Sequence, residues 1–315
     1  MIRQSWNGKR FYSFDSYMKQ TFGKKLYKVS LDAGCTCPTR DGTAGFGGCT
    51  FCSAQGSGDF ASSRVKSITE QIEDGIRLVE GKSHGGPYMA YFQAFTSTYG
   101  PVEKLRSQYF EAARHPAVEA ISIATRPDCL PDEILELLSE LQQEIPVYIE
   151  LGLQTIHEET AQAFHRGYPL SVFEQAVEAL SIREIPVIVH LILGLPGESR
   201  EDMLQSIEYL NQQPIHGIKL SMLHILKDTV MGEEYIRNPF PVFTLEEYVD
   251  LLITCLEHLR EDIVVHRITG DGPKNLLIAP LWSGRKRMVL NTIAHEMKIR
   301  NSWQGCHCPT KYTEE

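Results

Sequence analysis

Strand-like and helix-like segments alternate along the first 225 of the 315 residues, and this alternation constrains the fold most strongly. Apolar residues recur three and four positions apart, as in amphipathic helices, at 68–79, 131–138, 170–180 and 201–210. Compact apolar runs, which we predict to be strands, occur at 26–32, 88–95, 118–125, 146–153, 186–193 and 217–225, with a further candidate at 263–268. Strands that alternate with helices form βαβ units and a parallel sheet. We therefore predict an α/β protein with a curved sheet or incomplete (β/α)6 barrel.

The regular alternation is lost after about residue 226, so we predict three segments. Residues 1–24 form an N-terminal extension, 25–225 the partial barrel, and 226–315 a C-terminal extension that covers the mouth or side of the barrel. The first residues lack an apolar secretion signal, and the longest apolar stretch, 185–195, is too short to span a bilayer. We expect a cytoplasmic protein without a membrane partner.

Three cysteines lie in one glycine-rich loop after the first predicted strand. Two residues separate Cys49 from Cys52, and Cys37 lies upstream. Iron–sulfur clusters usually have four cysteine ligands, and a cluster held by three keeps one iron open for an exchangeable ligand. A zinc knuckle would need a fourth ligand nearby, but the next histidine, His84, is more than thirty residues away. A redox pair would not explain Cys37. The loop favours a metal cluster.

Polar residues follow five successive predicted strands, which is where barrel enzymes place their chemistry. The segments concerned are 93–99, 125–128, 150–167, 190–198 and 224–229. One buried polar residue at such a position is usually structural. Five successive strand ends beside a three-cysteine loop together indicate an active site.

The net charge of −9 is not that of a dedicated nucleic-acid-binding module. Two local clusters of basic residues oppose this average, one just before the cysteine loop and one near the C-terminus. Most such clusters are solvated surface, and RNA docking is the alternative. The clusters consist of Lys24, Lys25 and Lys28, and of Arg285, Lys286, Arg287, Lys298 and Arg300.

These motifs resemble those of radical S-adenosylmethionine (SAM) enzymes, in particular the YtqA/YhcC-like family, which is related to the catalytic subunit of Elongator. The resemblance covers nearly the whole chain and rests on segments 36–52, 125–131, 150–155 and 266–273. The wide spacing between Cys37 and Cys49 is a mark of this family, and Phe51 occupies its aromatic position. Cys35 departs from the pattern, because an aromatic residue is expected there.

The resemblance implies a radical SAM-type TIM-like barrel with a 4Fe–4S cluster on Cys37, Cys49 and Cys52. SAM would chelate the fourth iron. An electron from a flavodoxin- or ferredoxin-type donor would cleave SAM to a 5′-deoxyadenosyl radical, which abstracts hydrogen from the substrate. The family pattern implies that Arg166 pairs with the SAM carboxylate and that Gln154 and His190 reach the ribose. The remaining implied cofactor-binding residues are Gln93 and Thr96, near the methionine amino group, and Glu150.

The resemblance also points to tRNA as the substrate, by conversion of 5-carboxymethylaminomethyl-uridine at the wobble position to 5-aminomethyl-uridine. One alternative is a radical SAM enzyme that acts on a small molecule, like the coproporphyrinogen oxidase relatives. Another is a zinc-stabilised RNA-binding module. The tail with Cys306, His307 and Cys308 is not part of the family pattern. We interpret its cysteines as free surface thiols, with metal binding as the alternative.

Overall fold

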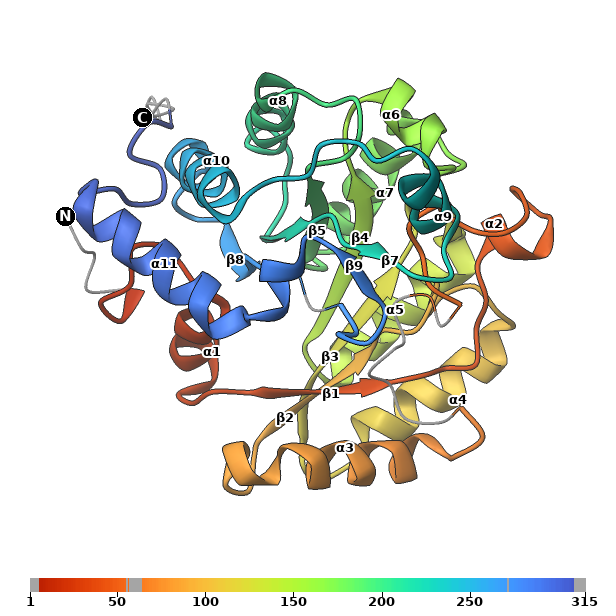
Figure 1. The fold of residues 1–315 in the computed structure, drawn as a ribbon. Coiled ribbons are helices and arrows are strands. Elements are labelled where there is room, and N and C mark those ends of the chain that lie inside the picture. The colour runs from red at the N-terminus through yellow and green to blue at the C-terminus, as the bar shows by residue number, and fades with distance from the viewer. Residues whose placement is uncertain (1–5, 55, 57–63, 271, 309–315) are drawn as a thin grey trace.

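The fold is a half-barrel of seven parallel strands, shown by a computed structural model that describes residues 6–54, 56, 64–270 and 272–308 (Figure 1). The strand order is β1-β2-β3-β4-β5-β6-β8. The predicted α/β class and incomplete barrel are therefore confirmed. The strands are β1 (Tyr27–Leu31), β2 (Tyr88–Phe92), β3 (Val118–Thr125), β4 (Val147–Gln154), β5 (Val187–Leu193), β6 (Gly217–Met222) and β8 (Val264–Arg267).

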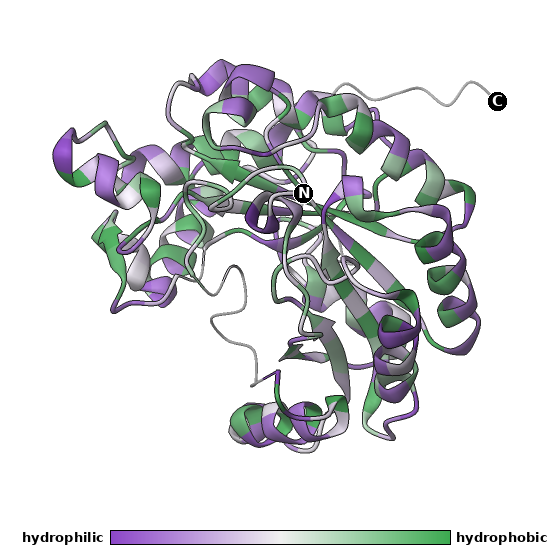
Figure 2. Cartoon of the chain, turned by 90° about the vertical axis from the view of Figure 1, so that its right-hand side faces the viewer, coloured by the Kyte–Doolittle hydropathy of each residue, from purple (hydrophilic) through white to green (hydrophobic). Residues whose placement is uncertain are grey.

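Helices surround the sheet because each of them has one apolar face to bury. Figure 2 shows the strands largely in the hydrophobic colour, whereas the helices carry both colours. Among the contacts, α3 packs on β1, α4 on β3, α5 on β4 and α7 on β5. The helices are α1 (Phe14–Phe22), α2 (Pro38–Asp41), α3 (Ile68–Ser83), α4 (Val102–Ala113), α5 (Asp132–Glu144), α6 (Glu158–Ala163), α7 (Leu170–Ile182), α8 (Arg200–Leu210), α9 (Val230–Arg237), α10 (Leu245–His258) and α11 (Lys286–Ile299), with short 3-10 helices η2 (Pro127–Cys129) and η3 (Leu281–Gly284).

The four helices predicted from periodicity are present as α3, α5, α7 and α8. Helix α3 begins with a capping box, in which the Ser67 side chain accepts from the Glu70 backbone N–H and the Glu70 carboxylate accepts from Ser67. Helix α5 begins after Pro131 with two acidic residues in its first turn, which suits the positive end of the helix dipole.

The sheet continues beyond residue 225, into the predicted C-terminal extension. Strand β8 pairs in parallel with β6, with Gly217 opposite Val264, and Ser13 adds a parallel bridge to Val265. The predicted strand 217–225 is two elements, because β6 ends at Met222 and a short β7 (Ile225–Leu226) pairs antiparallel with β9 (Leu277–Ala279).

Parts of the predicted extensions, residues 1–5 and 309–315, lie outside the described residues, as does residue 271 of the 266–273 motif. Among the helices that the structure describes, none has both the length and the apolar character needed to cross a bilayer.

Candidate active site

The cysteine loop leaves the C-terminal end of β1, and Cys37 occupies the N-cap position of the short helix α2 without a capping bond from its side chain. Arg40 closes the loop by donating hydrogen bonds to the carbonyl oxygens of Ser53 at 2.6 Å and Ala54 at 3.3 Å. Gly48, with φ of +82°, lies so close that a Cβ atom there would come within 2.9 Å of Arg40 Nε. The closed path of the loop therefore requires a glycine at this position.

One cavity of about 270 Å³ opens at the C-terminal ends of the strands. The structure brings together there all nine residues that the sequence marked as the candidate site. They are Cys37, Cys49, Cys52, Gln93, Thr96, Glu150, Gln154, Arg166 and His190. Strand ends that are distant in the sequence converge here because carboxyl ends of parallel strands share one edge of a sheet.

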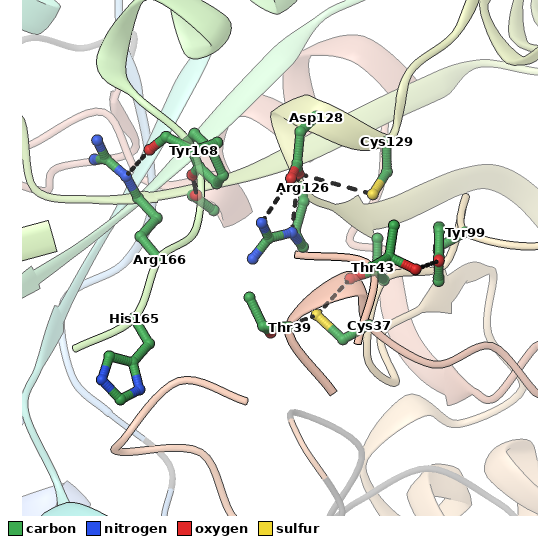
Figure 3. A network of polar contacts seen from close by, with 12 residues as sticks. Cys37, Thr39, Thr43, Tyr99, Arg126, Asp128, Cys129, His165, Arg166 and Tyr168 are labelled. Carbon is green, nitrogen blue, oxygen red and sulfur yellow. Dashed lines mark hydrogen bonds and ion pairs between the residues drawn. The ribbon is translucent and has the colours of Figure 1, made fainter. Parts of the chain in front are cut away.

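The three loop thiols lie together in this cavity. Cys37 Sγ accepts hydrogen bonds from Thr96 Oγ1 at 3.1 Å and Thr39 Oγ1 at 3.5 Å (Figure 3). A hydrogen bond between the side chains of Cys49 and Cys52 raises the pKa of Cys49 and lowers the pKa of Cys52. Metal ligation requires the thiolate, so three such cysteines in one cavity fit a metal cluster.

Cys35, two residues before the first of these cysteines, has a different environment. It packs in the hydrophobic core, and burial raises the pKa of its thiol to about 11. A buried thiol of this kind is chemically inert. Cys129 and Cys255 are buried as well.

Glu150 lies at the floor of the cavity and its side chain is fully buried. One polar residue from each of the strands β1 to β6 meets here. The carboxylate accepts hydrogen bonds from Lys28 Nζ (2.6 Å), Ser122 Oγ (2.7 Å), Tyr91 Oη (2.7 Å), His190 Nε2 (2.8 Å) and Lys219 Nζ. Both oxygens of Glu150 are thus satisfied by the protein. The residue is suited to orient its neighbours rather than to bind a cofactor directly.

The charges of this network determine its protonation. Burial alone would raise the pKa of Glu150, but the charges of Lys219 and Lys28 and the bond from His190 hold it well below its usual value. Burial lowers the pKa of Lys219, against the opposing charge of Glu150. Burial and the Lys219 charge lower the pKa of His190 to about 4, so its imidazole is neutral at neutral pH. An ionised carboxylate only accepts, so His190 carries its proton on Nε2 and Nδ1 is an acceptor.

Arg166 directs its guanidinium into the protein. Nε donates to the Tyr168 carbonyl at 3.0 Å, Nη1 to the Thr155 carbonyl at 2.7 Å, and Nη2 to Glu158 at 3.2 Å. Figure 3 shows the group directed away from Cys37, toward the chain around Tyr168. These bonds anchor the segment that follows β4.

Arg126 is a cavity residue for which the sequence analysis assigned no role. It forms a bidentate pair with Asp128, at 2.9 and 2.6 Å, and its guanidinium lies 5.0 Å from the centre of the Tyr168 ring. Figure 3 shows Arg126 between Tyr168 and Cys37. Its place in the 125–128 motif was a signal for its importance. The sequence did not reveal that the guanidinium of Arg126, rather than that of Arg166, lies toward Cys37.

Gln93 contacts the neighbouring strand β1, whereas Gln154 contacts its own strand, β4. Gln93 Oε1 accepts from Ser30 Oγ at 2.9 Å, and the Gln154 amide folds back onto the carbonyl oxygens of Gly152 and Leu153. Gln154 has a φ of +65° and follows an irregularity in the pairing of β4 with β5. Such conformations are costly for residues other than glycine and concentrate at functional sites.

The prediction that Lys24, Lys25 and Lys28 form a basic patch beside the cysteine loop was wrong. These residues precede or begin β1, whereas the loop follows it, so the length of the strand separates them. Lys28 points into the barrel and binds Glu150, and Lys24 pairs with Glu119 at 2.7 Å.

Arg285, Lys286 and Arg287 of the second basic cluster line a cavity of about 590 Å³. Lys298 and Arg300 do not line it, because they lie at the opposite end of α11, where Arg300 pairs with Asp250 at 2.6 Å. The cavity lining includes His224 and Gly270, which lie three residues beyond Ser221 and Arg267 of the first cavity. The second cavity therefore lies beside the C-terminal ends of β6 and β8, at the mouth of the barrel. The basic residues of this second cavity are Lys274, Arg285, Lys286 and Arg287, and no acidic residue is among its described lining residues.

Comparison with known proteins identifies the family. Residues 42–210 match the Radical SAM superfamily. The chain belongs to the radical SAM superfamily. Residues 215–299 match the Radical_SAM C-terminal domain. Radical SAM proteins use a 4Fe–4S cluster and SAM, so the family implies both cofactors, and the three free thiols of the cavity fit the cluster.

Two bacterial relatives match this radical SAM chain over most of its length. The chain is 42% identical to YtqA of Bacillus subtilis over 297 residues, covering 94% of this chain and 92% of YtqA. It is 37% identical to YhcC of Escherichia coli over 270 residues, covering 85% and 86%. The predicted YtqA/YhcC-like family is therefore confirmed.

Archaeal proteins are more distant relatives. A tRNA uridine(34) acetyltransferase of Methanocaldococcus infernus is 24% identical over 202 residues, covering 63% of this chain and 36% of that protein. The solved structure of Elp3 from the same organism has a TM-score of 0.66 at 16% identity and covers 89% of this chain and 64% of that one. The structural match shows a shared fold.

Proposed function

We propose that the cysteine cavity holds a 4Fe–4S cluster on Cys37, Cys49 and Cys52 together with SAM, and that the substrate is a wobble uridine of tRNA. The observation that carries the first part is the convergence of three free thiols with all other candidate residues in one cavity of a radical SAM chain. The cluster, when bound, supplies the electron that converts SAM into a radical able to take hydrogen from the substrate.

The residues around the thiols have complementary roles in binding SAM. Arg126 has a guanidinium near Cys37, and a guanidinium fork suits the SAM carboxylate. Neutral His190 offers Nδ1 as an acceptor, which suits a ribose hydroxyl. Glu150 fixes the orientation and tautomer of His190 through the 2.8 Å bond to Nε2. Arg166, with its bonds to the backbone, holds the shape of the cavity.

Two observations support tRNA as the substrate. A distant relative is a tRNA uridine(34) acetyltransferase, so an enzyme with a related chain segment acts on that nucleotide. The basic cavity with Lys274 and residues 285–287 adjoins the mouth of the barrel, where it could contact phosphates while a base enters the barrel. We propose the conversion of 5-carboxymethylaminomethyl-uridine to 5-aminomethyl-uridine. Its carboxylate suits the guanidinium of Arg267, which also lines the cavity.

A direct assay tests this function. The anaerobically reconstituted enzyme would be incubated with SAM, a reduced flavodoxin or ferredoxin, and tRNA that carries 5-carboxymethylaminomethyl-uridine. We expect 5-aminomethyl-uridine to appear by nucleoside mass spectrometry, with no product from the Cys37→Ala variant. Cells that lack the protein should accumulate the substrate nucleoside. If SAM is cleaved but the tRNA nucleosides are unchanged in both the enzyme assay and the cells, tRNA is rejected as the substrate and a small-molecule substrate is favoured.

A further inference from the structure

The segment 302–308 is docked against the C-terminal end of α10 by specific contacts. The fully buried Gln304 side chain donates to the carbonyl oxygens of Arg260 at 2.7 Å and Ile263 at 2.8 Å, and accepts from the Tyr12 backbone at 2.8 Å. The Gly305 backbone N–H donates to the Leu256 carbonyl at 3.0 Å. These bonds fix the path of the chain just before Cys306.

This docking brings three different metal-ligating side chains together. One ligand atom each of Glu257, Cys306 and His307 lies within 4.8 Å of the others. The His307 Nδ1 atom is 3.6 Å from Glu257 Oε2, and the His307 backbone N–H donates to the Glu257 carbonyl at 2.9 Å. Ligands of a tetrahedral zinc ion lie roughly 3.4–3.8 Å apart, given bond lengths of about 2.0–2.3 Å. The three groups are therefore close to the required spacing.

Further donors surround these three side chains. The His258 ring lies 5.7 Å from the His307 ring, centre to centre, and His258 Nδ1 is 3.6 Å from Glu208 Oε1. Cys308 lies on the same segment, with Sγ 3.7 Å from Asn211 Nδ2. His258 and Cys308 are thus candidates for a fourth ligand. Two carboxylates beside two histidines also give this surface an attraction for cations.

We propose that Glu257, Cys306 and His307 bind a zinc ion that ties the C-terminal segment to α10. The described residues that line the cysteine cavity do not include Glu257, Cys306 or His307. Figure 1 shows α10 on the side of the molecule opposite α2, and the segment 302–308 contacts the C-terminal end of α10. The site is therefore separate from the one that would hold the 4Fe–4S cluster. It has three protein ligands of the types that zinc prefers and room for a fourth.

Elemental analysis of the full-length reconstituted protein tests the proposal. After treatment with one equivalent of zinc and removal of the unbound ion, we expect about one zinc per chain in addition to the cluster iron. His307→Ala should keep the iron and lose the zinc, because the exposed His307 side chain has no role in the cysteine cavity. Cys35→Ala is the matched control, since it removes a buried thiol that lies outside both sites.

A titration with Co²⁺ provides a second measurement that does not depend on iron. In a variant with Ala at all three cavity cysteines, Co²⁺ should produce a thiolate-to-cobalt charge-transfer band that saturates at one equivalent. The double replacement Cys306→Ala with Cys308→Ala in that background should abolish the band, and His307→Ala should weaken binding more than about a hundredfold, because even the loss of an outer-shell partner costs 10–100-fold. No saturable binding, or a band that survives the double replacement, would overturn the proposal.

Discussion

The buried network around Glu150 leads to a quantitative prediction for the Glu150→Gln variant. Glutamine keeps the shape of the side chain but removes the charge and turns an amide N–H₂ toward groups that are themselves donors. Lys219, whose side chain is 4% exposed, would then be buried without a compensating charge, whereas Lys28 at 21% can still reach water. Removal of one partner from a buried ion pair typically costs about 3–5 kcal/mol. We expect the free energy of unfolding to fall by that amount.

Equilibrium urea unfolding at pH 7, followed by far-ultraviolet circular dichroism, measures this loss. Glu119→Gln is the matched control, because it removes a carboxylate paired with Lys24 at 2.7 Å at the surface. Such exposed pairs contribute about 0–1 kcal/mol. The reasoning would be refuted if both variants lost the same stability. Lys219→Met combined with Glu150→Gln should recover part of the loss, because it removes the uncompensated charge.

The pH dependence of the same measurement gives an independent check. The pKa of Glu150 is held below its usual value in the folded protein. Its contribution to stability is therefore complete above the unfolded-state pKa of about 4.3 and is lost as the pH falls through the folded-state pKa. The difference in stability between wild type and Glu150→Gln should be full at pH 7 and shrink on acidification below about pH 4. A constant difference would contradict the assigned charge state.

Three further predictions concern the cofactors and the substrate. Cys37→Ala should abolish iron binding on anaerobic reconstitution, and Cys35→Ala should retain it. Iron analysis measures both, and the reverse result would show that the ligand assignment is wrong. Arg126→Gln should weaken SAM binding by about 1.5–3 kcal/mol, the range for a hydrogen bond to a charged group, and an unchanged affinity in equilibrium dialysis would remove Arg126 from the site. Changing residues 285–287 to Ala should flatten the salt dependence of tRNA binding by up to about three units of slope, and an unchanged slope would place the phosphates elsewhere.

The sequence predicted the fold closely because its signals are local. Six of the seven strands of the half-barrel lie within the predicted ranges, and β4 extends one residue beyond its predicted end. The Ser67–Glu70 capping box marks the start of α3. The place of β8 in the barrel sheet was harder to predict from the sequence. Its pairing with β6 joins segments that are more than forty residues apart, and no local pattern reports such a contact.

Candidate residues of the cavity were predictable from their positions at strand ends, but their partners were not. Lys219 lies within an apolar strand, and only the curvature of the sheet brings it to Glu150. Lys28 was predicted as a surface cation because it stands beside Lys24 and Lys25 in the sequence. The alternation of side chains along β1 instead turns Lys28 toward the interior.

Position at a strand end thus selects candidates, and hydrogen-bond satisfaction discriminates among them. Arg126 and Arg166 both line the cavity. Arg166 donates hydrogen bonds to the carbonyl oxygens of Thr155 and Tyr168 and to the Glu158 carboxylate. A ligand carboxylate would have to displace these bonds, which already hold the chain. Arg126 is fixed through one edge of its guanidinium by Asp128. A guanidinium has five N–H donors, so a group anchored at one edge still has donors for a second anion. Arg126 is therefore the better partner for a carboxylate in this cavity.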